Sequence, residues 1–143
     1  MVSGPIILLE DDPDDIEIFQ EILKELDIPN EFVVFARPVE AFEFLEATVE
    51  QPLIIISDVN MPGMSGREFK NRLDSNERLK KKSIPFIFYS TSANRAFVTD
   101  AYLNLSVQGF FLKGNSYKEI KDQLRIIFDY WKVCQHPNSY LVA

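Results

Sequence analysis

Leu53-Ile54-Ile55-Ile56-Ser57-Asp58 is the stretch of sequence that decides the fold, and a loop containing Pro62 and Gly63 follows it. A continuous apolar run of this length, rich in β-branched residues, is typical of a strand buried on both faces of a parallel sheet. The run delivers a carboxylate, Asp58, to its end, and the Pro/Gly loop then begins. Ligands of parallel α/β sheets bind at the carboxyl ends of the strands. Asp58 is therefore the first candidate for a functional residue.

Three other apolar runs also end in polar residues. The run 5–9 ends in Glu10-Asp11-Asp12, the run 86–89 ends in Ser90-Thr91-Ser92, and the run 109–112 ends in Lys113. Carboxylates are preferred ligands of Mg²⁺, and hydroxyl and ammonium groups donate hydrogen bonds to phosphoryl oxygens. Together, the four strand ends predict a site for Mg²⁺ and a phosphoryl group.

Segments with helical periodicity separate the predicted strands. Apolar residues recur every three or four positions in 16–26, 42–49, 69–73, 97–105 and 120–131, and a short strand is expected at 32–35. Strand and helix thus alternate five times. This order predicts an α/β fold, namely a doubly wound five-stranded parallel sheet with helices on both faces, flavodoxin-like (βα)5.

Local signals set several boundaries. Acids follow Pro13 in the first turn of the first helix, and Ser116 with Glu119 forms a capping-box pattern before the last one. Val49 is expected on the inward face of the second helix. The polar stretch 74–83 and the end of the chain show no helical period. We therefore expect one domain over 1–134 and a C-terminal extension over 135–143.

Composition excludes several classes of protein. The 143 residues carry a formal charge of -7, which argues against a nucleic-acid partner. The basic run 78–82 is expected to be a solvated helix end. A lone cysteine, Cys134, suits a reducing compartment, and the first apolar run is too short for a signal peptide or a membrane span. These features predict a cytoplasmic protein without a membrane partner.

Four motifs in order carry a family resemblance. Leu8-Leu9-Glu10-Asp11-Asp12, Asp58-Val59-Asn60-Met61-Pro62-Gly63, Ser90 and Phe110-Phe111-Leu112-Lys113 resemble the receiver domain of two-component response regulators, the CheY-like superfamily. The resemblance covers roughly residues 5 to 134. It implies a stand-alone signalling switch, not an enzyme, that a histidine kinase or phosphotransfer protein phosphorylates.

The resemblance also implies roles for individual residues. Asp58 would be the phosphoacceptor; Glu10, Asp11, Asp58 and the backbone carbonyl of Asn60 would bind Mg²⁺; Ser90 and Lys113 would contact the phosphoryl group; Phe110 would be the switch aromatic. Whether Asp12 joins the metal site stays open. Receivers commonly dimerise through the face that here would contain Phe110, Tyr102 and the last helix, so a homodimer is a further expectation.

Two residues depart from the family pattern. Gly114 follows Lys113 where the family usually has a proline with a cis bond, and Thr91 follows Ser90 where a smaller residue is common. A cis bond before glycine costs roughly 3 kcal/mol relative to trans. We therefore predict a trans Lys113–Gly114 bond, with glycine turning the chain and Lys113 directed toward Asp58. Thr91 is expected to narrow access to the phosphoryl group.

Other functions compete with this interpretation. A receiver fold used only for docking, without phosphorylation, is kept open by Gly114 and Thr91. A phosphatase-type enzyme of the haloacid-dehalogenase kind also forms an aspartyl phosphate, but it needs a second acid where this chain has Asn60. No glycine-rich nucleotide loop follows any predicted strand. The phosphoryl-accepting switch is the function that the sequence favours.

Overall fold

A computed structural model describes residues 2–140, and its elements alternate as the sequence predicts. In chain order they are β1 (Ile6–Leu9), α1 (Pro13–Glu25), β2 (Phe32–Phe35), α2 (Pro38–Ala47), β3 (Ile54–Ser57), α3 (Gly66–Ser75), α4 (Glu77–Lys81), β4 (Phe86–Ser90), α5 (Arg95–Asn104), β5 (Gly109–Leu112), α6 (Tyr117–Val133) and the 3₁₀ turn η1 (Pro137–Tyr140). Each of the expected strands is present.

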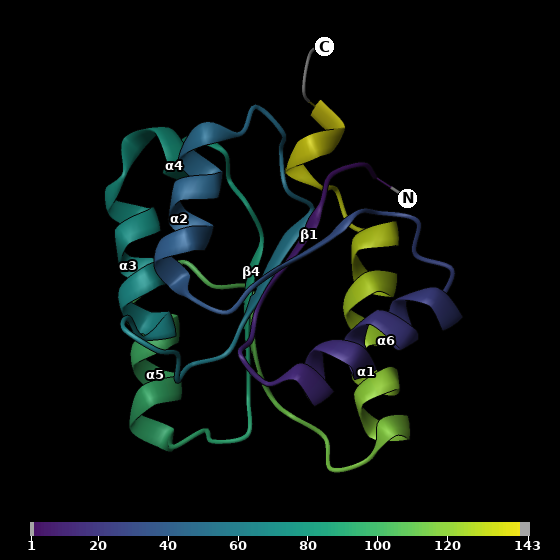
Figure 1. Cartoon of the computed structure of the whole chain (residues 1–143). Coiled ribbons are helices and arrows are strands. Elements are labelled where there is room, and N and C mark those ends of the chain that lie inside the picture. Colours follow the sequence, from purple (N-terminus) through teal and green to yellow (C-terminus); the bar gives the residue numbers. More distant parts are fainter. Residues whose placement is uncertain (1, 141–143) are drawn as a thin grey trace.

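The strands form one parallel sheet in the order β2-β1-β3-β4-β5. Helices α1 and α6 cover one face, and α2, α3, α4 and α5 cover the other (Figure 1). All residues of β1 and β3 are buried, and their side chains alternate between the two hydrophobic clusters on the two faces. The predicted doubly wound, five-stranded parallel fold is confirmed.

The register of the sheet sets the positions of the polar strand ends. Leu9 pairs with Ser57, and the Asp58 N–H donates to the Leu9 carbonyl at 3.0 Å. Glu10 and Asp58, the next residues on each strand, therefore lie side by side. At the ends of the neighbouring strands β4 and β5, the Lys113 N–H donates to the Ser90 carbonyl at 2.8 Å. All four polar ends thus lie along one edge, as parallel strands require.

Two stretches differ from the sequence predictions on the α2–α4 side. Val49 is 97% exposed because α2 ends at Ala47 and Thr48 takes an extended conformation. The polar stretch after α3 forms the short helix α4, because the Asn76 side chain accepts from the Leu79 N–H and Leu79 is buried. Helical periodicity missed α4 because five residues are too few to show a period.

The basic run 78–82 does more than end a helix in solvent. The Lys82 ammonium lies 3.1 Å from the Thr48 carbonyl, and the Arg78 guanidinium donates to the Glu46 carbonyl at 2.6 Å. These carbonyls belong to the C-terminal end of α2, where free acceptors and the negative end of the helix dipole favour cations. The run therefore fastens α4 to α2.

The C-terminal segment is ordered against the amino edge of the sheet, where the beginning of β1 also lies (Figure 1). The His136 ring is fully buried, with Nε2 2.7 Å from the Leu53 carbonyl and Nδ1 accepting from the Asn138 N–H at 2.9 Å. The Asn138 amide lies 3.0 Å from the carbonyls of Ser3 and Gln51. Residues 137–140 thus form a 3₁₀ turn although the sequence of 135–143 shows no helical period, and residues 141–143 lie outside the described part of the chain.

The His136 contacts predict a pH dependence of stability. Since Nδ1 accepts a hydrogen bond, the ring is neutral with its proton on Nε2, and burial lowers the pKa of His136 below its ordinary value of 6.5. The unfolded chain then binds more protons than the folded one, so His136 contributes stability above about pH 6.5 that is lost as pH falls. Thermal melts between about pH 7.5 and about pH 5.5 should show this loss.

The control for this experiment is His136→Gln, whose amide can still donate to the Leu53 carbonyl. All other titrating groups are common to both proteins, including Glu10. The variant should show a smaller decrease in melting temperature over the same pH interval. If the melting temperatures of the two proteins fall equally with pH, the pKa of His136 is the same in the folded and unfolded states.

Candidate functional site

Three carboxylates meet at the carboxyl edge of the sheet. One oxygen each from Glu10, Asp11 and Asp58 lies within 4.8 Å of the others. Glu10 and Asp11 follow β1 and Asp58 follows β3, so the register of two neighbouring strands makes the cluster. Mg²⁺ is bound in proteins by one or two carboxylates with waters and phosphate oxygens completing an octahedron. The donor set and its spacing fit a divalent cation.

Glu10 is the most buried of the three, with 4% of its surface exposed. Its Oε1 accepts from the backbone N–H groups of Asp11 and Asp12, at 3.2 and 3.1 Å. Burial raises the pKa of Glu10, with nearby Lys113 acting in the opposite direction. Lys113 lies 3.4 Å away, and a cation at the cluster would be a second positive partner for this buried carboxylate.

Asp58 is half-buried, and its Oδ1 accepts from the Val59 N–H at 2.6 Å. The loop after it is tightly packed, since the Gly66 N–H donates to the Val59 carbonyl at 2.8 Å. A Cβ on Gly66 would collide with the backbone oxygen of Asp58. The start of α3 therefore fixes the backbone that presents the Asp58 carboxylate.

The residues after β3 and β4 surround the cluster with polar groups. Ser90 is buried, and its hydroxyl oxygen accepts from the Ser92 N–H at 3.3 Å. The exposed Asn60 lies with its amide nitrogen 3.5 Å from the Ser92 hydroxyl. Thr91 is exposed. Asp12 caps α1 by accepting from the Asp14 N–H, which is a helix-capping role outside the three-carboxylate cluster.

Phe110 lies half-buried on β5 among other aromatic rings. Its ring centroid is 5.5 Å from that of Phe88 and 5.6 Å from that of Phe97, which is on α5. The ring thus connects the central sheet with a surface helix. A change at the strand ends that moves the Phe110 ring would therefore alter its packing against α5.

Lys113 points into the site from the end of β5, but it has partners that the sequence did not predict. Its side chain is only 7% exposed, and its ammonium lies 2.8 Å from Asp15 and 3.4 Å from Glu10. Burial alone would lower the pKa of Lys113, yet Asp15 and Glu10 together raise it. Among residues 2–140 no ion pair joins Lys113 to Asp58. The sequence pattern alone places Asp15 only among the acids of the first helical turn.

Gly114 follows Lys113 through a trans bond, as predicted. The described chain contains no cis peptide. The expectation that glycine supplies an unusual backbone turn was wrong, since Gly114 has no positive φ. Its place is instead explained by packing and hydrogen bonding. A Cβ there would lie 2.6 Å from the Glu119 Cβ, and the Gly114 N–H donates to Gln123 at 3.0 Å. Proline would have neither the space nor the donor.

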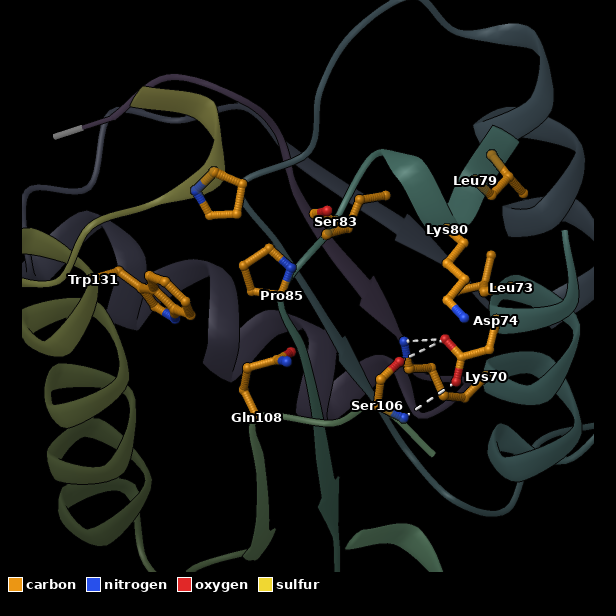
Figure 2. A pocket seen from close by; sticks show the side chains of 12 residues that line it. Lys70, Leu73, Asp74, Leu79, Lys80, Ser83, Pro85, Ser106, Gln108 and Trp131 are labelled. Atoms are coloured by element: carbon orange, nitrogen blue, oxygen red, sulfur yellow. Dashed lines mark hydrogen bonds and ion pairs between the residues drawn. The ribbon is translucent and has the colours of Figure 1, made fainter. Parts of the chain in front are cut away.

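A separate cavity of about 370 Å³ lies at the opposite, amino edge of the sheet. Figure 2 shows Asp74 bound to Lys70 and Ser106 on one of its walls, with Trp131 on the other side. Lys70 is buried, and its charge is already met by Asp74 at 2.8 Å and by the Phe86 ring. The cavity contains none of the acidic cluster, so the chemistry of the strand ends does not involve it.

A family model described as the response regulator receiver domain matches residues 6–125. The chain belongs to this family. The response regulator Rcp1 of Synechocystis is 30% identical over 131 residues, which cover 88% of this chain and 87% of Rcp1. The chemotaxis protein CheY1 of Helicobacter pylori is 32% identical over 89 residues, covering 62% and 68% of the two chains.

Solved structures of response regulators agree with this receiver domain in fold. The phosphorylated cyanobacterial phytochrome response regulator RcpA has a TM-score of 0.84 at 28% identity, over 94% of this chain and 99% of RcpA. The Mn²⁺-bound form of Rcp1 has a TM-score of 0.82 at 28% identity, with the same coverage. No helix within the described residues of the receiver has the length and hydropathy needed to cross a membrane.

Proposed function

We propose that this receiver is a phosphoryl-accepting switch of a two-component phosphorelay, with Asp58 as the acceptor. The observation that carries the proposal is the position of Asp58, half-buried beside Glu10 and Asp11 with carboxylate oxygens within 4.8 Å. The phosphorylated state of RcpA and the bound Mn²⁺ of Rcp1 support it by similarity. The donor would be a histidine kinase or a phosphotransfer protein, acting in the cytoplasm.

The transfer requires little from the protein besides positioning and charge neutralisation. A carboxylate oxygen of Asp58 forms a bond to phosphorus while the bond from phosphorus to the donor histidine nitrogen breaks, and that nitrogen keeps the electron pair. The Ser90 hydroxyl and the Lys113 ammonium would donate hydrogen bonds to the phosphoryl oxygens. In this account the chain is the acceptor of the transfer and not an enzyme.

Glu10, Asp11, Asp58 and the Asn60 carbonyl would hold Mg²⁺. The ion would neutralise charge that develops on the transferred phosphoryl group. Because it binds the folded cluster and not the unfolded chain, millimolar Mg²⁺ should raise the melting temperature. Asp11→Ala should reduce this rise without large loss of fold, since Asp11 is exposed. A Mg²⁺ titration that leaves the wild-type melting curve unchanged would contradict the metal site.

The response to phosphorylation is proposed to pass through Phe110 to the surface formed by α5, β5 and α6. Tyr102, Leu112 and Tyr130 on these elements are each at least half exposed. Exposed aromatic side chains favour interfaces. We expect a beryllofluoride mimic of the phosphoryl group to promote a homodimer through this surface. Sedimentation that gives one monomeric species with and without the mimic would contradict this expectation.

The C-terminal residues 135–143 are proposed to be an extension of a receiver domain formed by 1–134. The family match to 6–125 supports this division.

A phosphorylation-independent docking module and an aspartyl-phosphate phosphatase are the alternatives to the phosphoryl-accepting switch. Incubation with acetyl phosphate and Mg²⁺ tests all three functions: the switch keeps a stable phosphoryl group, the docking module gains none, and the enzyme turns the donor over continuously.

A further inference from the structure

The ammonium of Lys113 interacts with two carboxylates, one inside the acidic cluster and one outside it. Asp15 lies on the first turn of α1 at 2.8 Å, and Glu10 lies in the acidic cluster at 3.4 Å. The Lys113 side chain is 7% exposed and the Asp15 side chain 26% exposed, so both are largely shielded from water. Interactions between charges at such distances are strong in this setting. The nearer carboxylate, Asp15, is outside the metal-ligand cluster.

Glu10 cannot serve two cations equally well. A lysine that pairs closely with Glu10 neutralises the charge that a divalent ion would use and also repels that ion. The carboxylate of Asp15 offers Lys113 another partner, so the ammonium need not compete for Glu10. The backbone of Lys113 is held by its own N–H bond to the Ser90 carbonyl at 2.8 Å, so the choice between the two carboxylates belongs to the side chain.

We propose that Asp15 is a positioning residue of the metal site, which draws the Lys113 ammonium to 2.8 Å from itself, keeps it at the longer distance of 3.4 Å from Glu10, and so leaves Glu10 available to a divalent cation. The inference rests on the proposed function, because it assigns a role toward the metal site of that function. Asp15 acts through Lys113 and contacts neither the cation nor the phosphoryl group. It is a residue that the family motifs did not point to.

Titration calorimetry with Mg²⁺ on the full chain tests this role. Removal of a partner that orients a metal ligand typically costs 10–100-fold in affinity, and we expect Asp15→Asn to weaken Mg²⁺ binding by roughly tenfold. Asp15→Glu keeps the charge and should restore most of the affinity. The matched control is Asp14→Asn, which removes the same charge from the same helical turn at an exposed position without an ion pair in the described structure.

A double-mutant cycle shows whether the effect passes through Lys113. Lys113→Met keeps the apolar stem and removes the ammonium. In that background Asp15→Asn should change Mg²⁺ affinity no more than Asp14→Asn does. A full tenfold loss without the ammonium would mean that Asp15 acts on the cation directly and would overturn the proposal. So would an Asp15→Asn variant that matches Asp14→Asn in the wild-type background.

Failure of this inference can be separated from failure of the proposed function. Asp15→Asn that behaves as its control, in a protein that acetyl phosphate still labels at Asp58, overturns the role of Asp15 alone. The expected coupling in a protein that is never labelled supports that role and rejects the phosphoryl switch. Wild-type protein that binds no Mg²⁺ overturns the role of Asp15, and labelling then decides the phosphoacceptor independently. Melting curves of each variant confirm that it is folded.

Discussion

Asp58→Asn is expected to abolish phosphoryl incorporation from acetyl phosphate. The amide has no negative oxygen to form the bond to phosphorus, and no other carboxylate lies at the end of the central strand β3. The substitution keeps the shape of the side chain, so the fold should persist. Intact-mass measurement after incubation with donor and Mg²⁺ gives the result directly. Stoichiometric labelling of the variant would remove Asp58 from the role.

Asp12→Asn is the control for this substitution. It removes one charge next to the same site, and asparagine caps a helix as well as aspartate does. We expect the control to be phosphorylated at close to the wild-type level. Without Mg²⁺, Asp58→Asn should also melt slightly above the wild type, because clustered carboxylates repel one another and one charge is gone.

Gly66→Ala is expected to have the second largest effect. The added methyl group would collide with the Asp58 backbone oxygen and lie 3.1 Å from the Phe88 ring. Forcing one extra carbon into a packed interior costs about 1–3 kcal/mol. The relief of the collision must also move the backbone of Asp58. Urea unfolding should show the loss of stability, and labelling of the folded fraction should fall well below the wild type.

Gly63→Ala controls for the replacement of a loop glycine. Its φ of +83° makes alanine strained by about 1–2 kcal/mol, but a Cβ there meets no atom within 4 Å. It should therefore lose stability while keeping phosphorylation of its folded fraction. Equal labelling of the two alanine variants would mean that the packing of Gly66 does not determine the position of Asp58.

The sequence predicted the fold and the end of the sheet at which the site lies, because both depend on local patterns. The buried run that ends at Asp58 and the acids after the first strand define two strands without any tertiary information. Parallel strands place their ends together, so Glu10 and Asp58 could be expected side by side. The register, which pairs Leu9 with Ser57, then makes Glu10 and Asp58 direct neighbours.

The parts that the sequence missed depend on contacts between distant segments. Asp15 resembles any acid in a first helical turn, and only the fold shows that it faces Lys113. The packing of Gly114 against α6 and the burial of His136 likewise require positions far apart in the chain to meet. A signal for Asp15 did exist, since it lies in the first turn of the helix that follows the strand ending in the acidic cluster.

The central claim is that Asp58 accepts one phosphoryl group in a reaction that needs a divalent cation. The most direct measurement is the intact mass of the wild-type chain after incubation with acetyl phosphate, with Mg²⁺ or with a chelator. We expect a gain of one phosphoryl group in the presence of Mg²⁺, located at Asp58 by reductive trapping and peptide analysis, and no gain with the chelator. An unchanged mass with Mg²⁺, or a phosphoryl group found on another residue, would contradict the account.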